Sequence, residues 1–121
     1  MDLYREHILD HYRRPRNRGR IANPTASTTV QNPVCGDSLT VDVDIEKGII
    51  KDLRFNGTGC AISIASASML AERSVGRRVS EVRDEETTAI AEELGIEISG
   101  TRAKCALLAR SALQAALEKV Q

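Results

Sequence analysis

The chain has 121 residues, enough for one domain with its own hydrophobic core, and we expect a single domain over residues 1–121. Its 17 Lys and Arg residues balance its 17 Asp and Glu residues, and this zero formal charge argues against nucleic acid as a partner. No apolar stretch is long enough to cross a membrane and the charged N-terminus is unlike a signal peptide, so we expect a cytoplasmic protein without a membrane partner.

The first part of the chain predicts one helix followed by two strands. Apolar and aromatic side chains at four-residue spacing indicate a helix over residues 2–13, and Pro15 ends it. Residues 14–25 are predicted as a loop. Strand composition marks residues 26–31, and regular alternation of apolar and polar side chains marks residues 38–45.

A predicted hairpin continues from this second strand. Residues 46–48 form its turn, where Gly48 can take a positive φ, and residues 49–56 form the third strand. The alternation places Asp42 and Asp44 on the opposite face from the apolar side chains. We therefore expect a three-stranded antiparallel sheet with one face covered and these two carboxylates on the other face.

Helical patterns dominate the rest of the chain. Small residues characterise a predicted helix over residues 61–73, and a second predicted helix over residues 84–95 has an acidic first turn and ends at Gly95. The last predicted helix, residues 101–120, carries an apolar stripe (Ala106, Ala109, Leu113, Ala116, Leu117 and Val120). The expected fold class is α+β, with helices packed on one face of the sheet.

Three cysteines lie at boundaries of these elements. Cys35 is in the segment NPVCGD before a strand, Cys60 begins a helix after a glycine-rich turn, and Cys105 enters the last helix beside Arg102 and Lys104. The cytoplasm keeps thiols reduced, so no disulfide framework is expected. The alternative is an incidental loop thiol at Cys35 and a cysteine that fills a small site at Cys60. At Cys105 the alternative is a small residue on the apolar helix stripe, and there it is a serious rival.

The three boundaries together suggest a metal site. If they converge, three thiolates and the carboxylate of Asp37 provide three sulfur donors and one oxygen donor. This set suits tetrahedral Zn²⁺, or an iron–sulfur cluster with one non-cysteine ligand. The wide spacing of the cysteines is unlike a zinc knuckle and indicates a site that the fold assembles.

Two further features have weaker interpretations. His7 and His11 are four residues apart on one helix and could hold a metal, although a surface or packing role is favoured because no third ligand is near in sequence. The basic run from Arg13 to Arg20 is interpreted as a solvated loop or as a docking segment for an acidic partner.

The motifs resemble those of the IscU/SufU-type iron–sulfur cluster assembly proteins, also found as the N-terminal domain of NifU. They are DHYRRPRN, NPVCGD, GTGCAISIASAS and KCALL, in that order. The resemblance implies a compact α+β fold with a metal or cluster site at an exposed edge, and it implies Cys35, Asp37, Cys60 and Cys105 as the ligands. Isolated members often hold Zn²⁺ at the same site.

The resemblance also implies a function. Such a scaffold accepts persulfide sulfur from a cysteine desulfurase, builds a transient [2Fe-2S] cluster and passes it to acceptor or carrier proteins. An acceptor thiol must be accessible and partly ionised. Cys105, with two cations nearby, and Cys35, on the most flexible corner, are therefore both candidate persulfide acceptors. The hard carboxylate of Asp37 should weaken the hold of a thiolate site on its cluster, which suits a donor.

Two alternatives remain open at this point. Lys104 before the third cysteine is typical of SufU-type proteins, which favours a zinc-dependent sulfur acceptor that stimulates the desulfurase, whereas the short interval between Cys60 and Cys105 is typical of IscU. A structural zinc-binding interaction module is the third hypothesis. The segment IEISGTRAK lacks the chaperone-recognition motif LPPVK, so a dedicated Hsp70-type chaperone is not expected.

Overall fold

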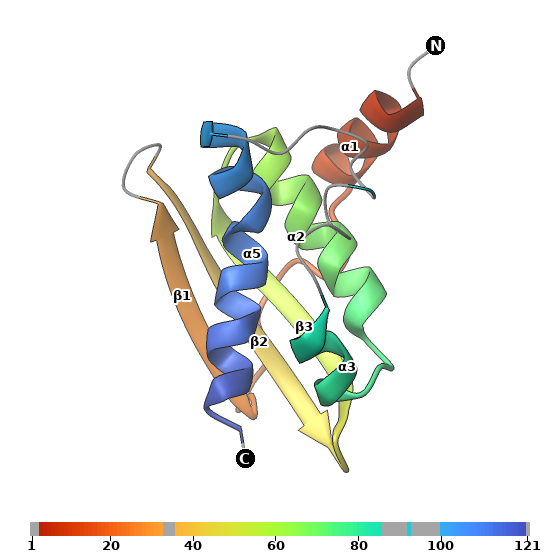
Figure 1. Cartoon of the computed structure of the whole chain (residues 1–121), viewed down its shortest axis with the longest axis vertical. Helices are drawn as coiled ribbons and strands as arrows, with labels where there is room; N and C mark the ends of the chain where they lie inside the picture. Colours follow the sequence, from red (N-terminus) through yellow and green to blue (C-terminus); the bar gives the residue numbers. More distant parts are fainter. Residues whose placement is uncertain (1–2, 33–35, 86–91, 93–99, 121) are drawn as a thin grey trace.

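A computed structural model describes residues 3–32, 36–85, 92 and 100–120 of the chain. Helices surround one side of a three-stranded sheet (Figure 1), which confirms the expected α+β class. In chain order the elements are α1 (Leu3–Arg13), β1 (Ala26–Asn32), β2 (Asp37–Glu46), β3 (Ile49–Thr58), α2 (Ala61–Ser74), α3 (Val79–Asp84) and α5 (Gly100–Glu118). None of the described helices is long and apolar enough to cross a membrane.

The sheet has the strand order β1-β2-β3, and both pairs are antiparallel, as predicted. A two-residue turn joins β2 to β3, with positive φ at both Lys47 (54°) and Gly48 (76°). Turns of this kind match the right-handed twist of the strands that they connect. The register shifts between Asp44 and Ile45, so a bulge lies close to the turn.

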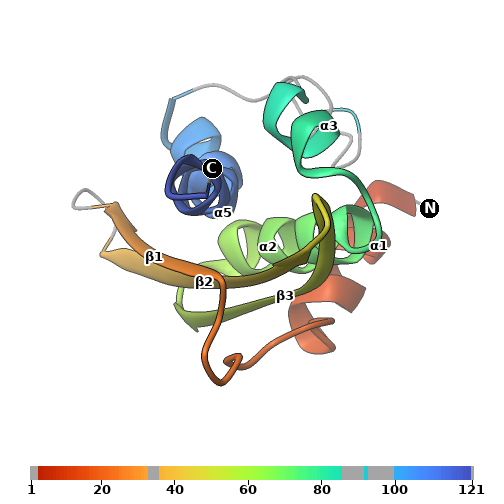
Figure 2. The same ribbon diagram turned by 90° about the horizontal axis from the view of Figure 1, so that it is seen from below.

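The hydrophobic core lies between the sheet and two helices. Figure 2 shows α2 and α5 above the same face of the sheet, with α1 beside α2. The largest fully buried side chains of the sheet and of α5 meet there: Leu39, Val41, Val43, Ile50, Leu53, Phe55, Leu113 and Leu117. Alanines fill the facing positions on the helices, and their small side chains allow the helix backbones to approach one another and the sheet.

The opposite face of the sheet is crossed by the loop of residues 14–25, as Figure 2 shows. This loop pairs with the outer edge of β3: Gly19 N donates to Phe55 O (2.8 Å), and Phe55 N donates to Asn17 O (3.1 Å). Part of its positive charge is also neutralised, because the Arg16 guanidinium binds Asp10 at 2.6 Å. Most arginines of the run (Arg13, Arg14, Arg18 and Arg20) are exposed, in agreement with a solvated loop, but the backbone of the loop is held against the sheet.

Asp42 is buried although it lies on the face of the sheet opposite the core, where only one covered face was expected. Its side chain points to that face, but the loop buries it completely. One carboxylate oxygen accepts hydrogen bonds from Arg20 Nε (2.6 Å) and Ile21 N (3.0 Å), and the other accepts one from Ser27 Oγ (2.6 Å). Burial alone would raise the pKa of Asp42, but these donors outweigh it and hold the pKa below the ordinary value.

His11 is buried against α2, in agreement with the packing role favoured for it. Its Nδ1 lies 2.7 Å from Ser68 Oγ, which also accepts a hydrogen bond from Arg16 N at 2.8 Å. Ser68 thus joins the His11 ring on α1 to the start of the loop at Arg16. Burial, followed by the nearby Arg16 and His7, lowers the pKa of His11.

The segment between α2 and α5 differs from the prediction. The short helix α3 was not predicted, and Asp84 is its last residue rather than the start of a new helix. Glu85 follows in an extended conformation, and its carboxylate pairs with Arg73 and Arg77. The remainder of the helix predicted for residues 84–95 lies outside the described residues, apart from Glu92.

Replacing Asp42 by Asn should destabilise the protein by about 1–3 kcal/mol, because Asn cannot match the charge-assisted bonds from Arg20 and Ser27. Chemical denaturation at neutral pH measures this loss. The exposed neighbour Asp44 provides the matched control, and Asp44→Asn should change the free energy of unfolding by less than about 0.5 kcal/mol. Equal effects of the two substitutions would contradict the role of the buried carboxylate.

Acidification should destabilise the protein through His11. Its folded-state pKa is lowered, so below the unfolded value of about 6.5 the unfolded chain binds a proton that the folded chain does not. The free energy of unfolding should then fall as the pH decreases towards the folded-state pKa, by at most about 1.4 kcal/mol per pH unit. Denaturation between pH 7.5 and 5 should show a shallower slope for His11→Gln than for His7→Gln, and equal slopes would refute the assignment.

Candidate metal centre

The metal ligands proposed from the sequence lie on elements that end at the same side of the molecule. Figure 1 shows the start of β2 and the N-termini of α2 and α5 at one end of the fold. Asp37 is the first residue of β2, Cys60 is the N-cap of α2, and Cys105 lies in the second turn of α5. Segments far apart in the sequence therefore meet at this end.

The ligand atoms of Asp37, Cys60 and Cys105 all lie within 4.8 Å of one another. Tetrahedral zinc with typical bond lengths would place such atoms roughly 3.5–3.8 Å apart, so small side-chain movements suffice to close the site. Cys60 is exposed, whereas Asp37 and Cys105 are 7% and 6% exposed. Asp37 and Cys105 thus form the buried side of the cluster, and an ion or a partner can reach it from the exposed side at Cys60.

Glycines shape both chain segments that lead into the cluster. Gly36 precedes Asp37 with a φ of 78°, and its N–H donates to Asn32 O to close the connection between β1 and β2. Gly57 has a φ of 134°, and a Cβ atom there would lie 2.0 Å from the carbonyl oxygen of Ser38. Only glycine allows β3 to approach β2 so closely just before the chain turns towards Cys60.

The Asp37 carboxylate is bound to the first turn of α2. Its Oδ2 accepts hydrogen bonds from Cys60 N (3.3 Å) and from Ser63 Oγ (2.5 Å). A negative charge is favoured there by the free N–H groups and the dipole of the helix. Sequence analysis did not single out Ser63, because its contact with Asp37 joins positions 26 residues apart in the chain.

Cys35, the fourth ligand expected from the sequence, lies outside the described residues. The described residues on either side, Asn32 and Gly36, bring the chain to the same end of the sheet as Asp37. Lys104 is exposed at the surface of α5, and the side chain of Arg102 is outside the described part. Ligation by all four residues therefore stays a prediction.

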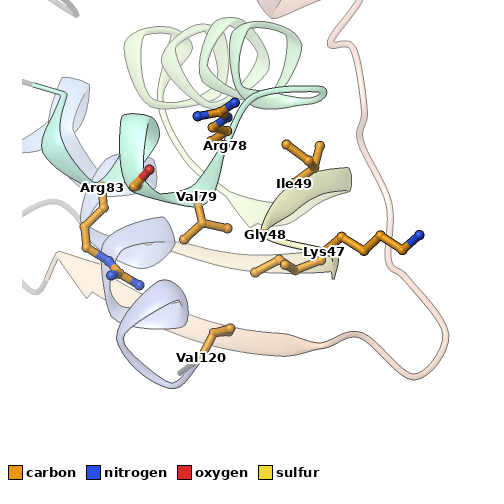
Figure 3. A pocket seen from close by; sticks show the side chains of 9 residues that line it. Lys47, Gly48, Ile49, Arg78, Val79, Arg83 and Val120 are labelled. Atoms are coloured by element: carbon orange, nitrogen blue, oxygen red, sulfur yellow. The ribbon is translucent and has the colours of Figure 1, made fainter.

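A pocket separate from this cluster lies at the other end of β2, beside the hairpin turn (Figure 3). It has a volume of about 410 Å³ and is lined by Ile45, Lys47, Gly48, Ile49, Arg78, Val79, Ser80, Arg83 and Val120. None of these side chains is a thiol, an imidazole or a carboxylate, so the pocket offers no metal ligands. Lys47 and Arg78 point away from one another in Figure 3, and the cations do not converge on one anion site.

Comparison with known proteins identifies the family of the chain. The pattern that defines the NifU-like N terminal domain matches residues 3–121. The chain belongs to this family. The resemblance inferred from the four sequence motifs is thereby confirmed for nearly the whole chain.

Relatives of this NifU-like domain include scaffolds of two types. The iron-sulfur cluster assembly scaffold protein IscU of Escherichia coli K12 is 37% identical over 118 residues, covering 94% of this chain and 91% of the relative. The zinc-dependent sulfurtransferase SufU of Bacillus subtilis is 40% identical over 77 residues, which are 64% of this chain and 52% of that protein. The chain is therefore homologous to both IscU-type and SufU-type proteins.

Solved structures show the same fold as this NifU-like domain. A putative iron-sulfur cluster assembly scaffold protein for the SUF system from Fervidobacterium islandicum superposes with a TM-score of 0.80. The two chains are 27% identical, and the match covers 93% of this chain and 94% of the other.

The different exposure of the two described thiols predicts different reactivity. In a Cys35→Ser variant of this NifU-like domain, iodoacetamide should alkylate Cys60 several-fold faster than Cys105, because Cys60 is open to solvent and Cys105 is nearly buried. Peptide mass spectrometry over a time course measures both rates in metal-free protein. Faster modification of Cys105 would contradict the described geometry.

Proposed function

We propose that this protein is an iron–sulfur cluster assembly scaffold. It accepts persulfide sulfur from a cysteine desulfurase, assembles a transient [2Fe-2S] cluster, and transfers the cluster to acceptor or carrier proteins. The observation that carries the proposal is the convergence of the Asp37, Cys60 and Cys105 ligand atoms within 4.8 Å. Its membership of the NifU-like family and its similarity to IscU support it.

The proposed ligands are Cys35, Asp37, Cys60 and Cys105. Three thiolates suit iron and zinc alike, and one carboxylate oxygen among them is the hardest and most readily exchanged donor. In a scaffold the cluster is cargo rather than a resident cofactor. Asp37 is therefore the ligand that we expect to leave first when an acceptor approaches.

Sulfur reaches the site through a thiolate. The acceptor thiolate attacks the outer sulfur of the desulfurase persulfide, forming a new S–S bond, and the old S–S bond breaks with its electron pair leaving on the desulfurase cysteine. We propose Cys35 or Cys105 as the acceptor. Because Cys105 is only 6% exposed, the residues that bury it would have to move before an incoming persulfide could reach its sulfur.

The proposed setting is the cytoplasm, where reduced thiols are maintained. Partners are a cysteine desulfurase and iron–sulfur acceptor or carrier proteins, with no nucleic acid, no membrane and no dedicated Hsp70-type chaperone. We further propose that residues 1–121 act as a single domain.

Anaerobic reconstitution with ferrous iron, cysteine, a cysteine desulfurase and a dithiol tests the scaffold function; the dithiol supplies the electrons that reduce persulfide sulfur to the sulfide of the cluster. Wild-type protein should develop the visible absorption and circular dichroism of a [2Fe-2S] cluster and transfer it to an apo-ferredoxin. Cys60→Ser should lose most of this signal because a soft thiolate ligand is replaced. Absence of any chromophore in wild type, where a known scaffold loads fully, would refute the proposal.

A zinc-dependent sulfur acceptor is the second candidate function. It is favoured by the similarity to SufU and by Lys104, which is exposed beside Cys105. This function predicts tightly held Zn²⁺ after purification and faster desulfurase turnover when the protein is added. Unchanged turnover in the presence of the zinc-loaded protein would exclude it.

A further inference from the structure

Ser63 is buried between two of the proposed ligands. It lies on α2, three residues after Cys60, and its side chain has no exposed surface. Its Oγ is 2.5 Å from Asp37 Oδ2 and 3.5 Å from Cys60 Sγ. Because an ionised carboxylate only accepts hydrogen bonds, the hydroxyl donates its one proton to Asp37, whatever Cys60 binds.

The first turn of α2 thus holds one oxygen of Asp37 with two donors, Ser63 Oγ and Cys60 N. Hydrogen bonds to a charged acceptor are stronger than neutral ones and have a narrow geometry. The N–H donor is fixed by the helix backbone. Of these two donors, the Ser63 hydroxyl is the one that belongs to a side chain, and it fixes one carboxylate oxygen beside Cys60.

Gly59 makes room for this arrangement. A Cβ atom at Gly59 would lie 2.9 Å from Ser63 Cβ and 3.5 Å from Asp37 Oδ2. Real Cβ atoms do not approach so closely, so a larger residue would push Ser63 away from the carboxylate. The φ of Gly59 is not positive, so backbone conformation does not require glycine there.

We infer that Ser63 is a positioning residue of the metal site: its hydroxyl fixes the Asp37 carboxylate beside Cys60 and Cys105 and thereby sets the affinity of the site for its metal. The inference rests on the proposed function in one respect, that Asp37 is a ligand. Groups that orient metal-binding side chains typically change metal affinity 10- to 100-fold. The alternative is that the bond merely joins β2 to α2.

A double-mutant cycle separates these two roles. Zinc affinity is measured by chelator competition for wild type, Ser63→Ala, Asp37→Ala and the double variant. Ser63→Ala should weaken zinc binding about 10- to 100-fold when Asp37 is present, and by less than about twofold in the Asp37→Ala background. With Co²⁺ as a spectroscopic probe, the visible spectrum of Ser63→Ala should shift towards that of Asp37→Ala.

Two matched variants complete the experiment. Ser66→Ala removes another buried hydroxyl of α2, whose Oγ has no hydrogen-bond partner among the described residues, and it should leave zinc affinity unchanged. Gly59→Ala keeps every polar group but displaces Ser63, so it should weaken binding as Ser63→Ala does. Thermal unfolding without metal checks that each variant folds. If Ser63→Ala does not fold, the zinc affinity of Gly59→Ala is compared with that of wild type instead.

Equal loss of affinity in both Asp37 backgrounds would overturn the positioning role, because it would show a general structural effect. Unchanged affinity of Ser63→Ala in otherwise wild-type protein would overturn it as well. Wild-type protein that binds zinc but never assembles a cluster refutes the scaffold function alone. Wild-type protein that binds neither zinc nor cobalt refutes both.

Discussion

The carboxylate of Asp37, bound to the first turn of α2, is the constraint on which the rest of the site depends. It joins the beginning of β2 to the N-terminus of a helix that starts 24 positions later in the chain. Cys60, as the N-cap residue, is placed by the same contact. Because the helix terminus favours negative charge, α2 stabilises an anionic ligand where a metal cation would bind.

The distance between Cys60 and Cys105 is set by the packing of α2 against α5. Ala65 and Met69 on α2 and Ala106 on α5 belong to one buried cluster, and the two alanines let the helices lie close together. Larger residues at such positions would separate the helices, and their N-termini would carry the two thiols apart. The packing of the apolar core is thus connected directly to the geometry of the proposed ligands, although neither of these alanines is a ligand.

Sequence reasoning located most of the fold because its signals were local. Alternation in β2 and β3 and the glycine at position 48 predicted the hairpin, and the convergence of Asp37, Cys60 and Cys105 was anticipated from their positions at element boundaries. The burial of Asp42 was missed because it depends on a loop with no periodic pattern folding under the sheet. Helix α3 was missed because six residues carry too little periodicity. Ser63 could be recognised only once β2 and α2 were placed together.

The loop that crosses beneath the sheet also makes the two sheet edges unequal. Residues 17–19 occupy the outer hydrogen-bonding groups of β3 around Phe55, so a foreign strand cannot add there. Within the described residues, β1 has no comparable backbone partner on its outer side, and its sequence ASTTVQN contains neither charge nor proline. If a further strand joins this sheet, in assembly or in aggregation, it adds to the outer edge of β1 and not to β3 around Phe55.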